Sequence, residues 1–418
     1  MTMESSSLKV PEHLNSAFFS EALNNGLNTR DVNILKLEFS LGSAAGDNYL
    51  SNIYRIVVTY TLEDSYPKEV FLITKCVPNI SNPNSMLSEI NVFNKERFMY
   101  LNILPQLEDI LVGVKLVPKC YYAIDNPIPT FAFEDMKAAG YSMSDRVTGL
   151  NEQHCQIALY KLGQYHAASI LLLQKNPKIR DSPLLQQGIF SSTRLKSERF
   201  QKFSQQNLQS FTDHIDKIPE YEEIVKKLRK LDFNEFVGQV AKAIELSNED
   251  TLVLGHGDMW VNNLMFKYDG DSPTDIVMID FQGSAFVSLG LDINYFFATS
   301  PSSHVRTSKK EELIEKSYYL GFKQTLEKHA FNMIPSLGDI KKEVQRKELF
   351  ELFCSITVLP IISMSKDDSE EMSVEKIREG KVKPSQLATK RFLEVMKNSI
   401  TTYDKHGLLD TEYIESVN

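Results

Sequence analysis

Several features that would place a chain in a special structural class are scarce in this sequence. The 418 residues include only four cysteines, at positions 76, 120, 155 and 354, and no two of them form a CxxC pair. Neither a zinc site nor a disulfide framework is therefore expected. Basic residues are not in excess either, because 46 Lys and Arg are set against 55 Asp and Glu, for a net charge of −9. Nucleic-acid-binding proteins usually carry a basic face, so we expect no nucleic-acid partner.

Long apolar stretches are missing as well. The most apolar segments, around 167–173 and 358–364, are far shorter than the ~20 residues needed to span a bilayer. The first 19 residues lack the basic region and apolar stretch of a signal peptide. These absences predict a cytoplasmic protein with reduced thiols and no membrane insertion, and they leave the oligomeric state open. The remaining composition, 42% hydrophobic and 24% charged, is that of an ordinary globular protein.

The residue pattern changes along the chain from strands to helices. The first third predicts a small antiparallel sheet, whereas the chain from residue 151 onward predicts long helices. The expected strands are 53–61, 69–77, 114–123 and 129–133. The expected helices are 11–23, 88–104 (ended by Pro105), 151–174, 196–246, 309–331, 340–363 and 387–403. This order predicts an α+β fold of two lobes, residues 1–136 and 137–418, with the boundary near Glu134-Asp135-Met136.

Two polar loops carry the residue types that phosphoryl transfer from ATP to a hydroxyl requires. One carboxylate must accept the hydroxyl proton, and two oxygen ligands must hold Mg²⁺ against the triphosphate. The segment HGDMWVNN at 256–263 offers Asp258 as the base and Asn263 as a ligand. Asp280 follows the apolar run IVMI and offers the second ligand, since an unpaired charge leaving a buried strand needs a partner. Asp275, on the turn before that strand, is a weaker competitor.

A lysine in the first third of the chain is a candidate for binding phosphates. Lys75 ends the strand FLITK and shares a face with Phe71 and Ile73 by period-2 alternation. We expect triphosphate oxygens to pair with it and a helical carboxylate to orient it. Glu96 is the preferred partner and Glu89, two turns earlier, is the rival. An exposed glutamate with no such role is the alternative for both.

Weaker signals come from two segments that flank the predicted sheet. The segment GSAAGDNY at 42–49, with Gly46 and Asn48, is expected to close over phosphates through its backbone N–H groups, although it lacks GxGxxG. Glu134 and Met136 are expected to present backbone groups to adenine at the lobe connection. Two further side chains have plainer interpretations. His166 is more simply a hydrogen-bonded core histidine than a catalytic base, and Trp260 a packing residue rather than a substrate stack.

Taken in order, these segments resemble the ecdysteroid kinase-like (CHK kinase-like) family, a relative of choline and aminoglycoside kinases. The resemblance runs from about residue 35 to 300. The matching pieces are GDNYLSNIYRIVVTY, FLITKCVP, FNKERFMYLNILP, FAFEDM, LGQYHAAS, HGDMWVNNLMFKY and IDFQGS, with LDINYFF after it.

The resemblance implies a protein-kinase-like fold that uses ATP and Mg²⁺. The roles it implies are those already given for Asp258, Asn263, Asp280, Lys75 and Glu96, with Asp292 as a structural acid behind the loop. The chain has HGD and DFQ where protein kinases have HRD and DFG, which favours a small alcohol over a protein as the acceptor. An ecdysteroid, another steroid or a xenobiotic alcohol is the expected substrate, for hormone control or detoxification. The alternatives are a choline- or aminoglycoside-type kinase and a catalytically inactive kinase-fold binding protein.

Overall fold

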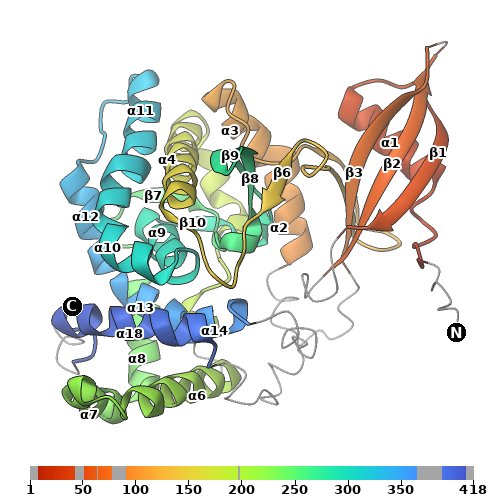
Figure 1. Ribbon diagram of the computed structural model, residues 1–418. Coiled ribbons are helices and arrows are strands. Elements are labelled where there is room, and N and C mark those ends of the chain that lie inside the picture. The colour runs from red at the N-terminus through yellow and green to blue at the C-terminus, as the bar shows by residue number, and fades with distance from the viewer. Residues whose placement is uncertain are drawn as a thin grey trace, which may run out of the picture.

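The fold is given by a computed structural model that describes residues 8–42, 51–63, 65–77, 91–195, 198–364 and 388–410. Figure 1 shows the N-terminal sheet and its covering helix at one end, and a larger, mostly helical body at the other. The predicted α+β class, a small antiparallel sheet ahead of a helical remainder, is confirmed. Within the described ranges, no helix is both long enough and apolar enough to cross a bilayer.

Five antiparallel strands form the N-terminal sheet in the order β1-β2-β3-β5-β4. Their bounds are β1 (Val32–Leu41), β2 (Asn52–Leu62), β3 (Lys68–Cys76), β4 (Cys120–Ile124) and β5 (Thr130–Glu134). β2, β3 and β5 lie close to their predicted positions, whereas the edge strand β1 was not predicted. The strand predicted over 114–123 begins only at Cys120. Its first part cannot pair with β5, because the N–H groups of Leu116 and Val117 donate to the Glu108 side chain.

The two faces of this sheet have different neighbours. Tyr54 and Ile56 on β2 are buried in the same apolar cluster as Phe19 of α1 (Ser16–Leu27). The alternate residues of β2 and β3, among them Lys75 on β3, lie on the opposite face of the sheet and line a cavity toward the helical body. α1 begins later than the predicted 11–23, because the Asn15 side chain accepts hydrogen bonds from the first N–H groups of the helix.

The helix predicted over 88–104 is wrong at its C-terminal end. The chain is helical from α2 (Val92–Phe98) through a π-helical turn at Met99–Ile103 into α3 (Leu104–Leu111). Pro105, which was expected to end the helix, lies in the first turn of α3. The N–H that proline lacks has no helical partner at that position, so proline is well tolerated there.

The helical body contains the remaining described α-helices. They are α4 (Glu152–Lys175), α5 (Ser192–Leu195), α6 (Glu198–Ile215), α7 (Glu222–Lys230), α8 (Phe233–Ala243), α9 (Leu289–Thr299), α10 (Ser303–Leu313), α11 (Leu320–Lys328), α12 (Leu337–Arg346), α13 (Glu348–Thr357), α14 (Leu359–Ile362) and α18 (Lys390–Lys405). The predicted segments 151–174, 196–246, 309–331, 340–363 and 387–403 fall largely on these helices. The sequence pattern therefore located these segments correctly, whereas α5 and α9 were not predicted.

Two small antiparallel sheets within the helical body place two loops next to each other. β7 (Leu252–Gly255) pairs with β10 (Ala285–Ser288), and β8 (Leu264–Asp269) lies between β6 (Tyr141–Met143) and β9 (Ser272–Met278). The loop 256–263 joins β7 to β8, and the loop 279–284 joins β9 to β10. The strands that precede and follow the first loop, β7 and β8, are paired with the strands that follow and precede the second loop, β10 and β9. The two loops must therefore lie side by side. The N–H of Ile279 donates to the carbonyl of Asn263 at 3.0 Å.

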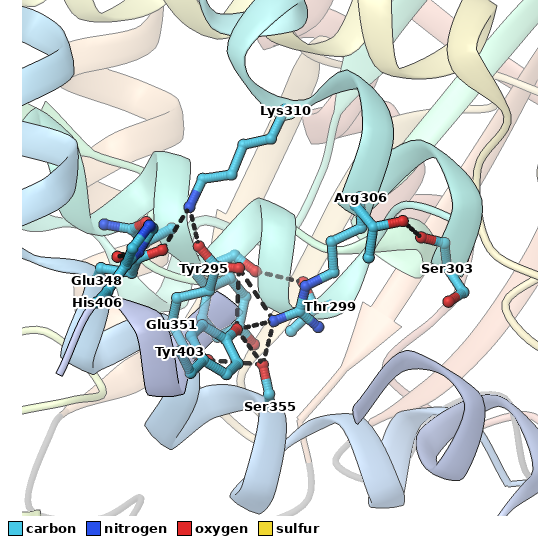
Figure 2. Close-up of polar contacts among 12 residues, drawn as sticks. Tyr295, Thr299, Ser303, Arg306, Lys310, Glu348, Glu351, Ser355, Tyr403 and His406 are labelled. Carbon is cyan, nitrogen blue, oxygen red and sulfur yellow. Dashed lines mark hydrogen bonds and ion pairs between the residues drawn. The ribbon is translucent and has the colours of Figure 1, made fainter. Parts of the chain in front are cut away.

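A buried polar cluster joins the C-terminal helix to this body (Figure 2). Arg306 on α10 donates to Glu351 Oε1 at 3.0 Å and to Ser355 Oγ at 2.6 Å, both on α13, and it contacts the Tyr403 hydroxyl on α18. Lys310 pairs with the other carboxylate oxygen of Glu351. Arg306 and Glu351 are both nearly inaccessible to solvent. Arg306 therefore depends on Glu351 for compensation of its charge, and Glu351 depends on Arg306 together with Lys310.

Replacing Arg306 with methionine should lower the free energy of unfolding by about 3–5 kcal/mol, because it leaves the Glu351 carboxylate short of a buried partner. Urea denaturation measures the change. Lys226→Met is the matched control, since its ion pairs with Glu222 and Glu223 are exposed to solvent and should contribute little to stability. Equal losses in the two variants would show that the buried cluster does not stabilise the fold.

Candidate active site

A cavity of about 320 Å³ lies between the N-terminal sheet and the two adjoining loops. Lys75 and Glu96 line it from the N-terminal side, and Asp258, Asn263 and Asp280 line it from the helical body. Residues 134–137, which begin at the last residue of β5, line one end. Five side chains that the sequence predicts as functional are thus brought to one cavity from four separate segments of the chain.

Asp258 is held by hydrogen bonds to both of its carboxylate oxygens. The hydroxyl of Tyr295, on α9, donates to Oδ1 at 2.6 Å, and the Asn263 side-chain amide donates to Oδ2 at 3.1 Å. Burial raises the pKa of Asp258 to about 7, although the hydrogen bond from Tyr295 opposes this shift. Burial also raises the pKa of Tyr295 well above its ordinary value, so its hydroxyl keeps the proton that it donates. The carboxylate therefore has a fixed orientation at the cavity wall.

Helix α9 also fixes the backbone of the Asp258 loop. The buried carboxylate of Asp292 accepts hydrogen bonds from the N–H groups of His256 at 2.6 Å and Gly257 at 3.0 Å. These bonds and one from His166 lower the pKa of Asp292 despite its burial. Gly257 has a φ of 78°, and a Cβ there would lie 2.2 Å from the Gly283 carbonyl oxygen. Only glycine lets the two loops approach this closely.

Asp280 begins the second loop in a left-handed backbone conformation, with φ 66° and ψ 69°. Aspartate adopts this region more readily than most residues, and the turn directs the chain away from β9. The Asp280 side chain accepts from Lys75 Nζ at 3.0 Å and from the Gln282 amide at 3.3 Å. It keeps 27% of its side chain exposed, more than either Lys75 or Glu96.

Lys75 lies between two carboxylates. Its ammonium donates to both Glu96 oxygens at 2.8 Å and to Asp280. Burial disfavours the charged lysine, but Asp280 and Glu96 outweigh that effect and raise the pKa of Lys75. Burial raises the pKa of Glu96, and Lys75 opposes that rise. The lysine is therefore cationic, and α2 is tied to β3 through Glu96.

The end of the cavity at residues 134–137 offers a backbone hydrogen-bond donor. The backbone N–H of Met136 has no partner in the described part of the chain. The Glu134 side chain is engaged by Lys115 Nζ at 2.7 Å and by the N–H of Lys119. Asp135 is paired with Arg55 of β2, whose Nη2 lies 3.2 Å from Asp135 Oδ1.

Other residues singled out in the sequence have definite places. His166 is fully buried and hydrogen-bonded to Asp292 and Tyr318, which confirms the core interpretation. Asp275 bonds to Lys161 and Tyr141 and lines a different cavity, of about 600 Å³, that contains none of the predicted site residues. Trp260 packs against an apolar cluster and also contributes to the wall of the smaller cavity. Gly46, Asn48 and the rival Glu89 lie outside the described residues.

Two contributors were not found from the sequence. Tyr295 is three residues after Asp292, so both lie on one face of α9, and that spacing was the available signal. Arg55 is the single charged residue in the strand segment IYRIVVTYT, and it alternates with buried residues. A charge on such a strand is a signal of a polar partner, but the partner, Asp135, is 80 positions away.

The residues present fit a magnesium-bound triphosphate. No group of three His, Cys, Asp or Glu side chains suited to a metal occurs among the described residues. Asn263 uses its amide nitrogen on Asp258, and no residue in the described ranges engages its amide oxygen. Asp280 adds a partly exposed carboxylate. Two oxygen donors beside a lysine suit Mg²⁺, which keeps several waters and takes further ligands from phosphates.

Comparison with known proteins places the chain in a family. Residues 45–331, more than half of the chain, match the model of the ecdysteroid kinase-like family. No curated protein gives a significant match.

Several solved structures are similar at low identity. An ethanolamine kinase from Plasmodium vivax is 15% identical, with 82% of this chain and 81% of that one covered, at a TM-score of 0.39. The aminoglycoside 2′-phosphotransferase-IIIa, in a GDP complex, is 14% identical over 94% and 100%, at a TM-score of 0.38. A choline kinase from Streptococcus pneumoniae is 13% identical over 80% and 98%, at a TM-score of 0.33. The family match covers both loops of the cavity, together with Lys75 and Glu96, and this chain belongs to the ecdysteroid kinase-like family.

Proposed function

We propose that this protein transfers the γ-phosphoryl group of ATP to a hydroxyl group of a small molecule. One observation carries the proposal. A fixed carboxylate, two candidate oxygen ligands for a metal and a buried, carboxylate-paired lysine line a single cavity. These are the groups that phosphoryl transfer needs, because the reaction depends on positioning and on charge stabilisation.

Asp258 is the proposed general base. The acceptor hydroxyl binds beside the carboxylate and gives its proton to it as its oxygen bonds to the γ-phosphorus. The bond from that phosphorus to the ADP oxygen breaks, so the products are ADP and the phosphorylated acceptor. Tyr295 and Asn263 keep the carboxylate in one orientation, which suits a base that must lie within hydrogen-bond reach of the proton.

The nucleotide is proposed to lie along the cavity, with its base near Met136 and its phosphates near Lys75. The free N–H of Met136 supports the first placement, and the cationic state of Lys75 supports the second. Asn263 and Asp280 would hold Mg²⁺, which neutralises phosphate charge in such reactions. We propose the lobe boundary at 136/137, so that each lobe contributes one side of the nucleotide site.

The proposed acceptor is an ecdysteroid or another steroid or xenobiotic alcohol. The family description supports this class, and a choline- or aminoglycoside-type acceptor is the alternative. The helices within 196–246 and 309–363 contribute no residue to the described lining of the cavity. Trp260, Asn262 and Gln282, which do line it around Asp258, are therefore the proposed contacts for the acceptor.

Replacing Asp258 with asparagine should lower turnover by roughly 10²–10⁴-fold, the usual contribution of a general base. The affinity for Mg·ATP should change little, because the amide occupies the same volume. Steady-state kinetics and isothermal titration calorimetry measure the two quantities. Turnover at the wild-type rate would refute the base assignment.

Replacing Asp280 with alanine should abolish most of the increase in ATP affinity that Mg²⁺ produces. Loss of a residue that only hydrogen-bonds a metal ligand weakens metal affinity by roughly 10–100-fold. Loss of a direct ligand should weaken Mg²⁺-dependent ATP binding by at least as much. Asp275→Ala is the matched control, because Asp275 is close in sequence but lines the other cavity. If both variants keep the wild-type dependence on Mg²⁺, the metal is bound elsewhere.

Incubating the protein with Mg·ATP and a panel of alcohols should yield one class of phosphorylated product. The panel should contain ecdysteroids, other steroids, plant glycosides, choline, ethanolamine and aminoglycosides, with mass spectrometry detecting the added phosphate. Phosphorylation confined to the cationic amines would overturn the steroid assignment and favour the alternative. No product from any alcohol, with Mg·ATP bound, would favour the inactive binding protein.

A further inference from the structure

Arg55 lines the proposed nucleotide cavity near the end that residues 134–137 form. In the β2–β3 ladder, Ile53 is opposite Lys75 and Arg55 is opposite Ile73. Same-face residues on a strand are ~7 Å apart, so Arg55 is about that distance from the level of Lys75. The displacement is toward the end of β5, since Ile73 is paired with Phe133 and Leu72 with Glu134. If the phosphates bind at Lys75 and the base lies toward the end of β5, the base is next to Arg55.

The Arg55 side chain is held in place from the chain segment that follows β5. Its Nη2 donates a hydrogen bond to Asp135 Oδ1 at 3.2 Å, and its Nε, which makes no hydrogen bond in the described part of the chain, forms an ion pair with Asp135 Oδ2 at 2.5 Å. The charge-assisted hydrogen bond and the ion pair together hold the guanidinium beside Asp135. Asp135 is itself fixed, because Oδ1 also accepts from the N–H of Lys137.

The two partners are not equally buried. Only 2% of the Asp135 side chain is accessible, whereas 29% of the Arg55 side chain is accessible and contributes to the cavity wall. The pair therefore has its acid inside the protein and part of its guanidinium at the cavity. Across the cavity, the helical body contributes the apolar side chains Met265 and Ile279. A flat ring between these walls would meet methionine and isoleucine on one side and the guanidinium on the other.

We propose that Arg55 is a nucleotide-binding residue that stacks on the purine ring of ATP, with Asp135 holding the guanidinium parallel to the base. The inference rests on the proposed function, because it takes the cavity to be a nucleotide site. An arginine is suited to the task, since its planar, weakly hydrated cation stacks on aromatic rings while its edge stays hydrogen-bonded. Asp135 compensates the positive charge, so the site attracts the base without adding net charge near it.

The test compares two ligands that share a chain of three phosphates, of which only ATP also carries a nucleoside. Isothermal titration calorimetry gives the affinity of the full-length protein and of Arg55→Met for Mg·ATP and for Mg·tripolyphosphate. Loss of the stacked cation should weaken ATP binding by roughly 3–30-fold and leave tripolyphosphate binding unchanged. Arg97→Met is the matched control, because it removes an arginine from an exposed pair with Asp125 outside the cavity, and it should alter neither affinity.

The double variant Arg55→Met/Asp135→Asn protects the test against misfolding, because it leaves no buried acid without a partner. It should melt as the wild type does and show the same selective loss of ATP affinity. Unchanged ATP affinity in both variants overturns the inference, and so does an equal loss for both ligands. If the wild type binds neither ligand, the nucleotide site itself is wrong and the proposed function fails with it. If the wild type binds Mg·ATP but Arg55→Met does not lose ATP affinity selectively, only the proposed stacking is overturned.

Discussion

The site depends on one buried ammonium group shared by two carboxylates. Lys75 joins β3 to Glu96 on α2 and to Asp280 on the loop after β9, over distances of 2.8 and 3.0 Å. A buried cation and its acids stabilise a structure only when all are present and well placed. Without the lysine, two acids would face each other across the cavity, and without either acid the lysine would lose part of its compensation. The sheet, α2 and the helical body are therefore held in the one arrangement that gives the cavity its shape.

The acids outnumber the cations around this contact. Asp258, Asp280, Asp292 and Glu96 are close together, and the raised pKa of Asp258 reflects its burial and, to a lesser extent, Asp280. Helix α9 relieves part of this crowding, since Asp292 is compensated by two backbone N–H groups and Asp258 by the Tyr295 hydroxyl. A magnesium ion would relieve the rest, because a divalent cation is the strongest compensation available to neighbouring carboxylates.

Local patterns in the sequence predicted the parts of the molecule that depend on neighbouring residues. The loop residues Asp258 and Asn263 follow one another within five positions, and Asp280 directly follows an apolar strand, so each was visible as a polar break between buried segments. Alternation along β3 placed Lys75 on the correct face. The C-terminal limit of α3 was missed because a π-helical turn moves Pro105 into a helical first turn. The start of β4 was missed because Glu108 takes the N–H groups of the preceding residues.

What the sequence by itself determined was the change from strands to helices along the chain, the α+β class and the identity of five candidate residues. Periodicity, turn residues and isolated polar positions are local properties, so they can be recognised from neighbouring residues in the sequence. Only the tertiary structure decided that Arg55 is held by Asp135, that Tyr295 donates to Asp258, and that Lys75 lies between Glu96 and Asp280. The groups in these contacts are 80, 37, 21 and 205 positions apart. Contacts over such distances arise from strand pairing and helix packing, which no single segment of the sequence specifies.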